Sequence, residues 1–211
     1  MSTIKTNQLA HTANGASVFT LPQTDGSANE FIKTDGSGNL AFAEAGGGIT
    51  HAVTYRLNAS HTYSGSSTNL ITSWEFADNA FDGKLEDSNT WSLPSNGIFS
   101  FPVTGIYSIS IDIMMSHMND SNAWCGIELG VTTNNGTSYG GAAKIYNQIV
   151  QQSSSTTQYT TAHAQAIVDV TDISQTKYRI TFFTDQNEAV KLNGDSDENK
   201  TSIKVIRLGD T

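Results

Sequence analysis

The chain has 211 residues, of which 37% are hydrophobic and only 15% charged, and its 20 acidic and 11 basic side chains give a net charge of -9. An acidic surface repels phosphate backbones, so we expect no nucleic-acid partner. The sequence contains one cysteine, and it lacks both an apolar run of signal-peptide length and one that could span a membrane. We therefore expect no intrachain disulfide, synthesis in a cytoplasm without a signal peptide, and no membrane insertion.

The first 45 residues contain short apolar pieces, at residues 18–21, 31–32 and 40–42, separated by clusters of turn-forming residues. The sequence Thr-Asp-Gly-Ser occurs twice among them, at residues 24–27 and 34–37. Because Asp-Gly pairs favour tight hairpin turns, the pattern predicts a meander of short strands, too few to close a core in one chain. We expect a stalk intertwined with its own copies or an arm that docks on another protein. A flexible low-complexity tail is the alternative.

Residues 45–48 read Ala-Gly-Gly-Gly, which predicts a flexible joint between an arm at residues 1–48 and a head at residues 49–211. In the head, segments in which apolar and polar residues alternate are separated by turn residues. Segments at this spacing are typical of an all-β sandwich. The expected strands are two within residues 97–113 and one each at residues 52–57, 74–76, 126–131, 143–149, 162–170, 178–183 and 202–208.

The segment from Gly97 to Ile113 predicts two strands joined by a corner at Pro102 and Gly105. After the corner, apolar residues at positions 107, 109, 111 and 113 alternate with polar ones, as in a strand with one buried face. The order Phe-x-Phe-Pro-x-x-Gly-x-Tyr, followed by such a strand, resembles the signature of a jelly-roll superfamily. This superfamily comprises complement-type globular heads and tumour-necrosis-factor-like (TNF-like) domains.

Residues 199–208 and 178–183 carry the same resemblance, as the closing and penultimate strands of such heads. Residues 173–177 replace the Gly-Asp turn that is common in the family. The resemblance implies a TNF-like jelly-roll sandwich that forms a homotrimer and acts as a binding or structural module, not as an enzyme. In such trimers aromatic side chains face the threefold axis. Our candidates are Phe101, Tyr107 and Phe182, each with an ordinary core position as the alternative.

A second resemblance lies in the arm. The run Thr-Asp-Gly-Ser-Gly-Asn-Leu-x-Phe at residues 34–42 resembles a linker common in tail-fibre and other virion proteins of tailed bacteriophages, and residues 1–5 are similar to openings in that group. This implies a virion fibre, spike or head decoration whose residues 1–45 bind other virion proteins. Its outward knob would present polar loops to a host surface glycan or protein, at residues 58–67, 134–141 and 151–158.

Two other functions stay open. A secreted or cell-surface module, similar to a trimeric lectin or cytokine, would use the same head. A hydrolytic spike enzyme would need carboxylates gathered in a groove. The sequence contains no Gly-x-Ser-x-Gly, His-Glu-x-x-His or phosphate-binding motif, so we expect no enzymatic activity, and we interpret Cys125 as a core thiol.

One cluster of metal-ligand type occurs in the acidic segment at residues 193–199, where Asp195, Asp197 and Glu198 are candidate calcium ligands. A solvated acidic loop is the alternative, because the segment lacks the spacing of a helix-loop-helix calcium site. We expect no other cofactor.

Overall fold

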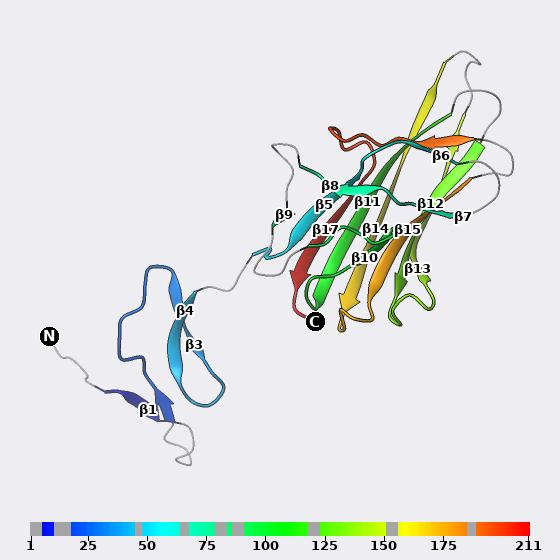
Figure 1. The fold of residues 1–211 in the computed structure, drawn as a ribbon. Helices are drawn as coiled ribbons and strands as arrows, with labels where there is room; N and C mark the ends of the chain where they lie inside the picture. Colours follow the sequence, from blue (N-terminus) through cyan, green and yellow to red (C-terminus); the bar gives the residue numbers. More distant parts are fainter. Residues whose placement is uncertain are drawn as a thin grey trace. The chain divides into compact units, whose positions relative to one another are not determined.

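The computed structural model describes residues 6–10, 18–44, 48–63, 68–78, 84–85, 91–117, 123–150, 156–184 and 189–211. The chain divides into two compact units, Met1–Gly48 and Ile49–Thr211. Every regular element in the described residues is a β-strand (Figure 1), which confirms the predicted all-β class. This part of the chain contains no helix of the length and apolar character needed to cross a membrane.

The first unit contains two small antiparallel sheets. They pair β1 (Gln8–Ala10) with β2 (Val18–Thr20), and β3 (Glu30–Thr34) with β4 (Leu40–Glu44). Only the second Thr-Asp-Gly-Ser copy closes a hairpin, between β3 and β4, because the first copy lies in the connection from β2 to β3. The predicted Asp-Gly hairpin therefore forms once.

Asp35 organises the β3–β4 turn. Its carboxylate accepts hydrogen bonds from the backbone N–H groups of Ser37 and Asn39, at 2.7 and 3.1 Å, and from the Asn39 side-chain amide at 2.7 Å. These bonds, that from the Asn39 side chain first, lower the pKa of Asp35. Gly36 takes a φ of 79°, which a residue with a β-carbon rarely adopts. The Asp-Gly pair thus contributes both an acceptor and a backbone conformation to this turn.

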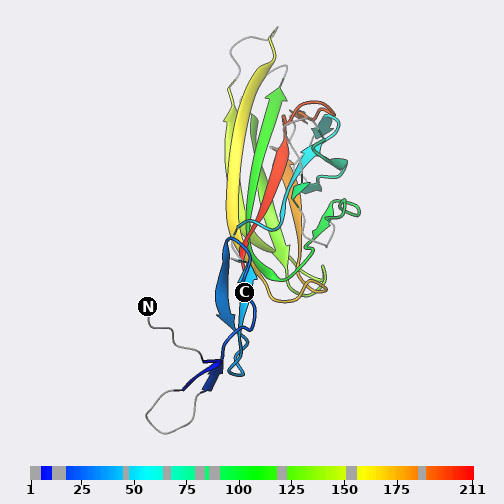
Figure 2. The same cartoon turned by 90° about the vertical axis from the view of Figure 1, so that its left-hand side faces the viewer.

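The head, Ile49–Thr211, consists of two antiparallel sheets. The first has the central strand order β14 (Gln158–Val170), β11 (Gly105–His117), β17 (Ser202–Gly209), β5 (Ala52–Leu57), and Figure 2 shows these four strands side by side. Short strands extend it, namely β8 (Trp74–Phe76) and β9 (Lys84–Leu85) beside β5, β16 (Val190–Leu192) beside the end of β11, and β6 (His61–Tyr63) beside β16. The second has the order β10 (Ile98–Ser100), β15 (Lys177–Thr184), β12 (Ala123–Thr132), β13 (Gly140–Ile149), with β7 (Thr68–Leu70) also on β15.

The pairing of the long strands and β10 is nested. Along the chain, the first of these strands, β5, pairs with the last, β17, and the second, β10, pairs with the last but one, β15. Inside them β11 pairs with β14, and β12 pairs with β13. Nested pairing of this kind results when one long antiparallel hairpin is rolled into two facing sheets. The head is therefore a jelly-roll sandwich.

The core lies between the two sheets and is held by aromatic contacts. Phe99 of β10 stacks on Tyr178 with ring centroids 4.6 Å apart, and meets Tyr55 of the other sheet edge-on at 5.1 Å. At the Pro/Gly corner, the Tyr107 hydroxyl donates a hydrogen bond to the Val103 carbonyl at 2.8 Å. The contacts of Phe99 with Tyr178 and Tyr55 contribute about 0.5–1.5 kcal/mol each beyond the apolar area that they bury. The predicted alternation along β11 is confirmed, since its odd-numbered residues from 107 to 113 are buried.

Candidate functional site

The three predicted interface residues lie inside the head. Phe101, Tyr107 and Phe182 each expose 4% or less of their surface in the single chain. Phe101 packs on Tyr107 with ring centroids 4.7 Å apart, and Phe182 packs on Tyr63 at 5.1 Å. Since neighbours in the same chain already cover these rings, almost no surface is left for a second chain. The alternative interpretation, an ordinary core position, is the one that the structure supports.

A row of mostly aliphatic side chains, exposed at its two ends and partly buried between them, crosses the outer face of the first sheet. Paired residues of an antiparallel sheet lie on the same side, and Ser108 of β11 pairs with both Ile167 and Ile206. Ile206 pairs in turn with Ala52, and Ala52 pairs with Leu85. The ends of the row are well exposed, Ile167 at 69% and Leu85 at 51%. We call Ile167, Ile206, Ala52 and Leu85 the aliphatic row.

Polar side chains follow on the same face of the first sheet. The Nδ1 atom of His163 lies 2.8 Å from Asp112 Oδ1, and the Nζ atom of Lys204 lies 3.6 Å from Asp112 Oδ2. Arg56 is buried there and pairs through Nε with Glu75 Oε1 at 2.7 Å. The outer face of the first sheet therefore combines an apolar strip with a charged one.

Three aromatic rings meet on the outer face of the second sheet. Trp124 of β12, Tyr146 of β13 and Phe183 of β15 have ring centroids between 5.0 and 6.0 Å apart. We call these residues the aromatic cluster. The Nζ atom of Lys144 lies 4.8 Å from the Phe183 ring centroid and 3.2 Å from Glu128 Oε2. The hydrogen bond with Glu128 is the main cause that raises the pKa of Lys144, so its ammonium stays charged.

The close packing of the aromatic cluster depends on Gly126. This residue pairs with Tyr146 on one side and with Phe183 on the other. A β-carbon at Gly126 would lie 2.2 Å from the Ile145 carbonyl oxygen and 2.4 Å from the Phe183 ring. Glycine therefore lets the two rings close over β12. This cluster was not predicted from the sequence, although the alternation along β12 and β13, which places Trp124 and Tyr146 outward, indicates part of it.

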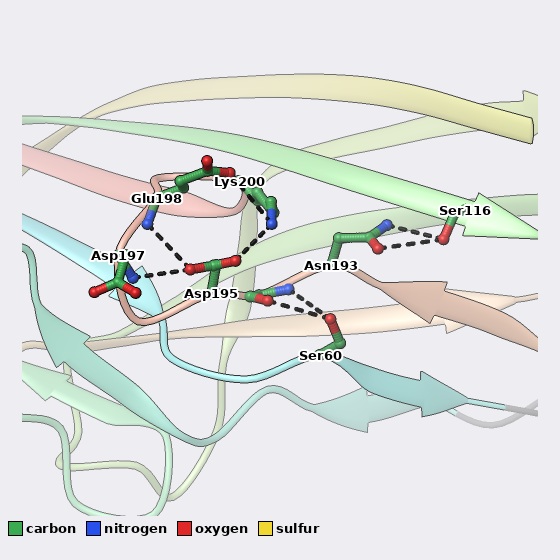
Figure 3. Close-up of polar contacts among 8 residues, drawn as sticks. Ser60, Ser116, Asn193, Asp195, Asp197, Glu198 and Lys200 are labelled. Carbon is green, nitrogen blue, oxygen red and sulfur yellow. Dashed lines mark hydrogen bonds and ion pairs between the residues drawn. The ribbon is translucent and has the colours of Figure 1, made fainter.

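The carboxylates of two of the three predicted calcium ligands, Asp195 and Glu198, are bonded to other groups of the acidic loop (Figure 3). Asp195 Oδ1 accepts hydrogen bonds from the backbone N–H groups of Asp197 and Glu198 at 2.9 and 3.3 Å. Lys200 Nζ lies 2.5 Å from Asp195 Oδ2 and 3.2 Å from Glu198 Oε2, and its hydrogen bond is the first cause that lowers the pKa of Asp195. Among the described residues, no group of three or more His, Cys, Asp and Glu side chains is placed to hold a metal ion. The alternative, a solvated acidic loop, fits this geometry better.

Cys125 is a core residue, as predicted. It is fully buried, and its Sγ atom lies 3.3 Å from the Met115 sulfur. Burial raises the pKa of the thiol to about 12. A protonated thiol without contact with solvent is a poor nucleophile, which fits a packing role.

Of the three polar loops predicted to face a receptor, the loop at residues 134–141 is described throughout. Asn134 Oδ1 accepts hydrogen bonds from Thr132 Oγ1 at 2.6 Å and from the Ser138 backbone N–H at 3.0 Å. Much of the hydrogen-bonding capacity of this loop is thus used within it. Residues 64–67 and 151–155, which belong to the other two loops, lie outside the described residues.

The first unit leaves large apolar side chains in solvent. Leu9 and Phe19 pair with each other between β1 and β2, and both are exposed, as are Phe31 and Ile32 on β3. Two-stranded sheets of this size are marginally stable in water. In the single chain, both small sheets of the first unit therefore carry exposed apolar side chains.

A scan against protein-family models finds no match for this chain, and a search of curated proteins finds none. Among solved structures, this chain is similar to Eiger TNF from S. frugiperda, with 12% sequence identity and a TM-score of 0.47. The match covers 78% of this chain and 96% of that chain. The head is a jelly roll because of its nested strand pairing, independently of this likeness.

Proposed function

We propose that the chain forms a homotrimer whose TNF-like heads pack through the outer face of the first sheet. The aliphatic row carries this proposal. A strip of mostly aliphatic side chains across several strands, well exposed at both ends, is a surface of the kind that obligate interfaces bury. The resemblance of residues 99–107 to the signature of TNF-like heads supports a trimer, but it does not specify which face of the head forms the contact.

The proposed role of this trimer is structural and adhesive, as a fibre, spike or head-decoration protein of a tailed-bacteriophage virion. The exposed apolar side chains of the first unit support attachment to a larger assembly, and the bacteriophage assignment depends on the resemblance at residues 1–5 and 34–42. The head would face outward as a binding knob. The alternative, a secreted or cell-surface trimeric module, would use the same head, but it gives the apolar side chains of the first unit no partner.

Light scattering on the purified full chain, and on residues 49–211, tests the trimer. We expect a mass three times the 22.6 kDa of the single chain, and a proportionate mass for the head alone. A monomeric head would contradict the trimer. The virion role is tested by mass spectrometry of phage particles purified from lysates of the source culture. It is contradicted if the protein is abundant in the culture but absent from the particles.

A further inference from the structure

The aromatic cluster is a surface that the proposed trimer leaves unexplained. Tyr146 is 60% exposed and Trp124 is 41% exposed, while Phe183 lies beneath them and is almost covered. Large aromatic side chains carry more apolar surface than most residues, and holding two of them in water forgoes stability that burial would provide. Exposed Tyr and Trp side chains in one cluster are characteristic of binding surfaces.

Polar groups lie on both sides of the rings. Along β12 and β13, the pair Trp124 and Gln148 is followed by the pair Gly126 and Tyr146, and then by Glu128 and Lys144. These outward positions place an amide at one side of the aromatic cluster and a carboxylate with an ammonium at the other. Aromatic side chains with a few polar groups beside them are the lining found in small-ligand sites, where the polar groups fix the orientation of the ligand.

Charge restricts the ligand. Lys144 and Glu128 form an ion pair next to the rings, so their opposite charges cancel. The ammonium of Lys144 already lies over the Phe183 and Tyr146 rings, which disfavours a second cation on them. An uncharged ligand with many hydroxyl groups fits such a surface better than an ion does.

Size restricts the ligand as well. From the exposed fractions of Tyr146 and Trp124, the cluster offers on the order of 250 Å² of ring surface, since each such side chain has about 150–250 Å². A stable protein interface needs about 800 Å² from each partner. The two rings alone match the area of one or two sugar rings, whereas a folded partner would also have to bury the residues around them.

We propose that the aromatic cluster binds the pyranose ring of a neutral carbohydrate. The C–H groups on one face of the sugar stack on Tyr146 and Trp124, while its hydroxyl groups bond to Gln148 and to the Glu128 carboxylate. The inference rests on the proposed role of the head as an outward-facing binding knob, and it names the ligand class and the site. Its chemistry involves association alone, and no bond is made or broken.

The test uses the full chain on an array of immobilised oligosaccharides of glucose, galactose, mannose and N-acetylglucosamine, with sialylated and sulfated glycans for comparison. A neutral glycan that binds is then titrated by calorimetry against Tyr146→Ala, Trp124→Ala and Phe31→Ala. Phe31 is the matched control, because it is an aromatic residue that is 45% exposed and lies on β3 of the first unit, outside the head. We expect each change in the aromatic cluster to weaken binding at least about tenfold, and the control to leave it unchanged.

The inference is overturned if no neutral glycan binds, if only charged glycans bind, or if Phe31→Ala weakens binding and Tyr146→Ala does not. Thermal unfolding of each variant verifies that it is folded, which we expect because both rings are exposed. Light scattering on the same samples separates this inference from the trimer. A monomer that binds the glycan refutes only the trimer, and a trimer that binds none refutes only the carbohydrate site.

Discussion

Replacing Ile167 by aspartate should dissociate the proposed trimer. Full burial of an isoleucine side chain contributes about 1.5–3 kcal/mol. Because 69% of Ile167 is exposed in the single chain, covering it in an interface contributes about 1–2 kcal/mol per protomer. Three copies contribute about 3–6 kcal/mol to the trimer, and an unpaired carboxylate in the contact adds a desolvation cost. The association constant should fall by a factor of at least about 100.

Sedimentation velocity at micromolar concentration measures this effect directly. The wild-type chain should sediment as a trimer, and Ile167→Asp should sediment mainly as a monomer with an unchanged circular dichroism spectrum. Ile173→Asp is the control, because Ile173 is also exposed but lies in the connection between β14 and β15. If Ile167→Asp stays trimeric, or if both variants dissociate equally, the aliphatic row is not the interface.

Three further predictions concern single positions. Burial raises the pKa of Cys125 to about 12, so iodoacetamide should modify this thiol only in denaturant. The free energy of unfolding should also fall as the pH rises above 9.0, the ordinary pKa of the thiol, because the unfolded chain then loses a proton that the native chain keeps. In urea, Gly126→Ala should lower the free energy of unfolding by about 1–3 kcal/mol, whereas Gly209→Ala, with open space at its β-carbon position, should not. Calcium should leave the unfolding temperature unchanged, because Lys200 already pairs with Asp195, and a rise would indicate a calcium site.

The sequence predicts the strands of the head well where one face of a strand is apolar and the other polar. In β14, the residues from Ala162 to Val170 alternate between apolar and mostly polar side chains, and the apolar set faces inward. Strand β5 has the bounds that were predicted, at residues 52–57. Period-2 alternation is reliable here because moving the register by one residue would expose the whole apolar set.

The same alternation does not identify which apolar residue faces a partner. Phe182 and Phe183 are adjacent, so their chemistry alone cannot show that Phe182 points into the core and Phe183 joins the aromatic cluster. Tyr107 and Phe101 are buried by neighbours that lie far from them in sequence. One is Tyr178, whose ring centroid lies 5.1 Å from that of Phe101. Pairing across strands decides these positions, and it is set by the topology of the whole sheet.

The two outer faces of the sandwich have different chemistry, and this makes the two proposals compatible. The aliphatic row offers side chains that cannot form hydrogen bonds, next to a charged strip, and such a surface is best covered by a second copy with complementary groups. The aromatic cluster offers rings flanked by hydrogen-bonding groups, on the sheet that packs against the other side of the core. If the first face is buried at the trimer axis, the second stays accessible on each protomer. Three weak carbohydrate sites on one particle-bound trimer then bind a glycan-coated surface with an avidity that one site cannot provide.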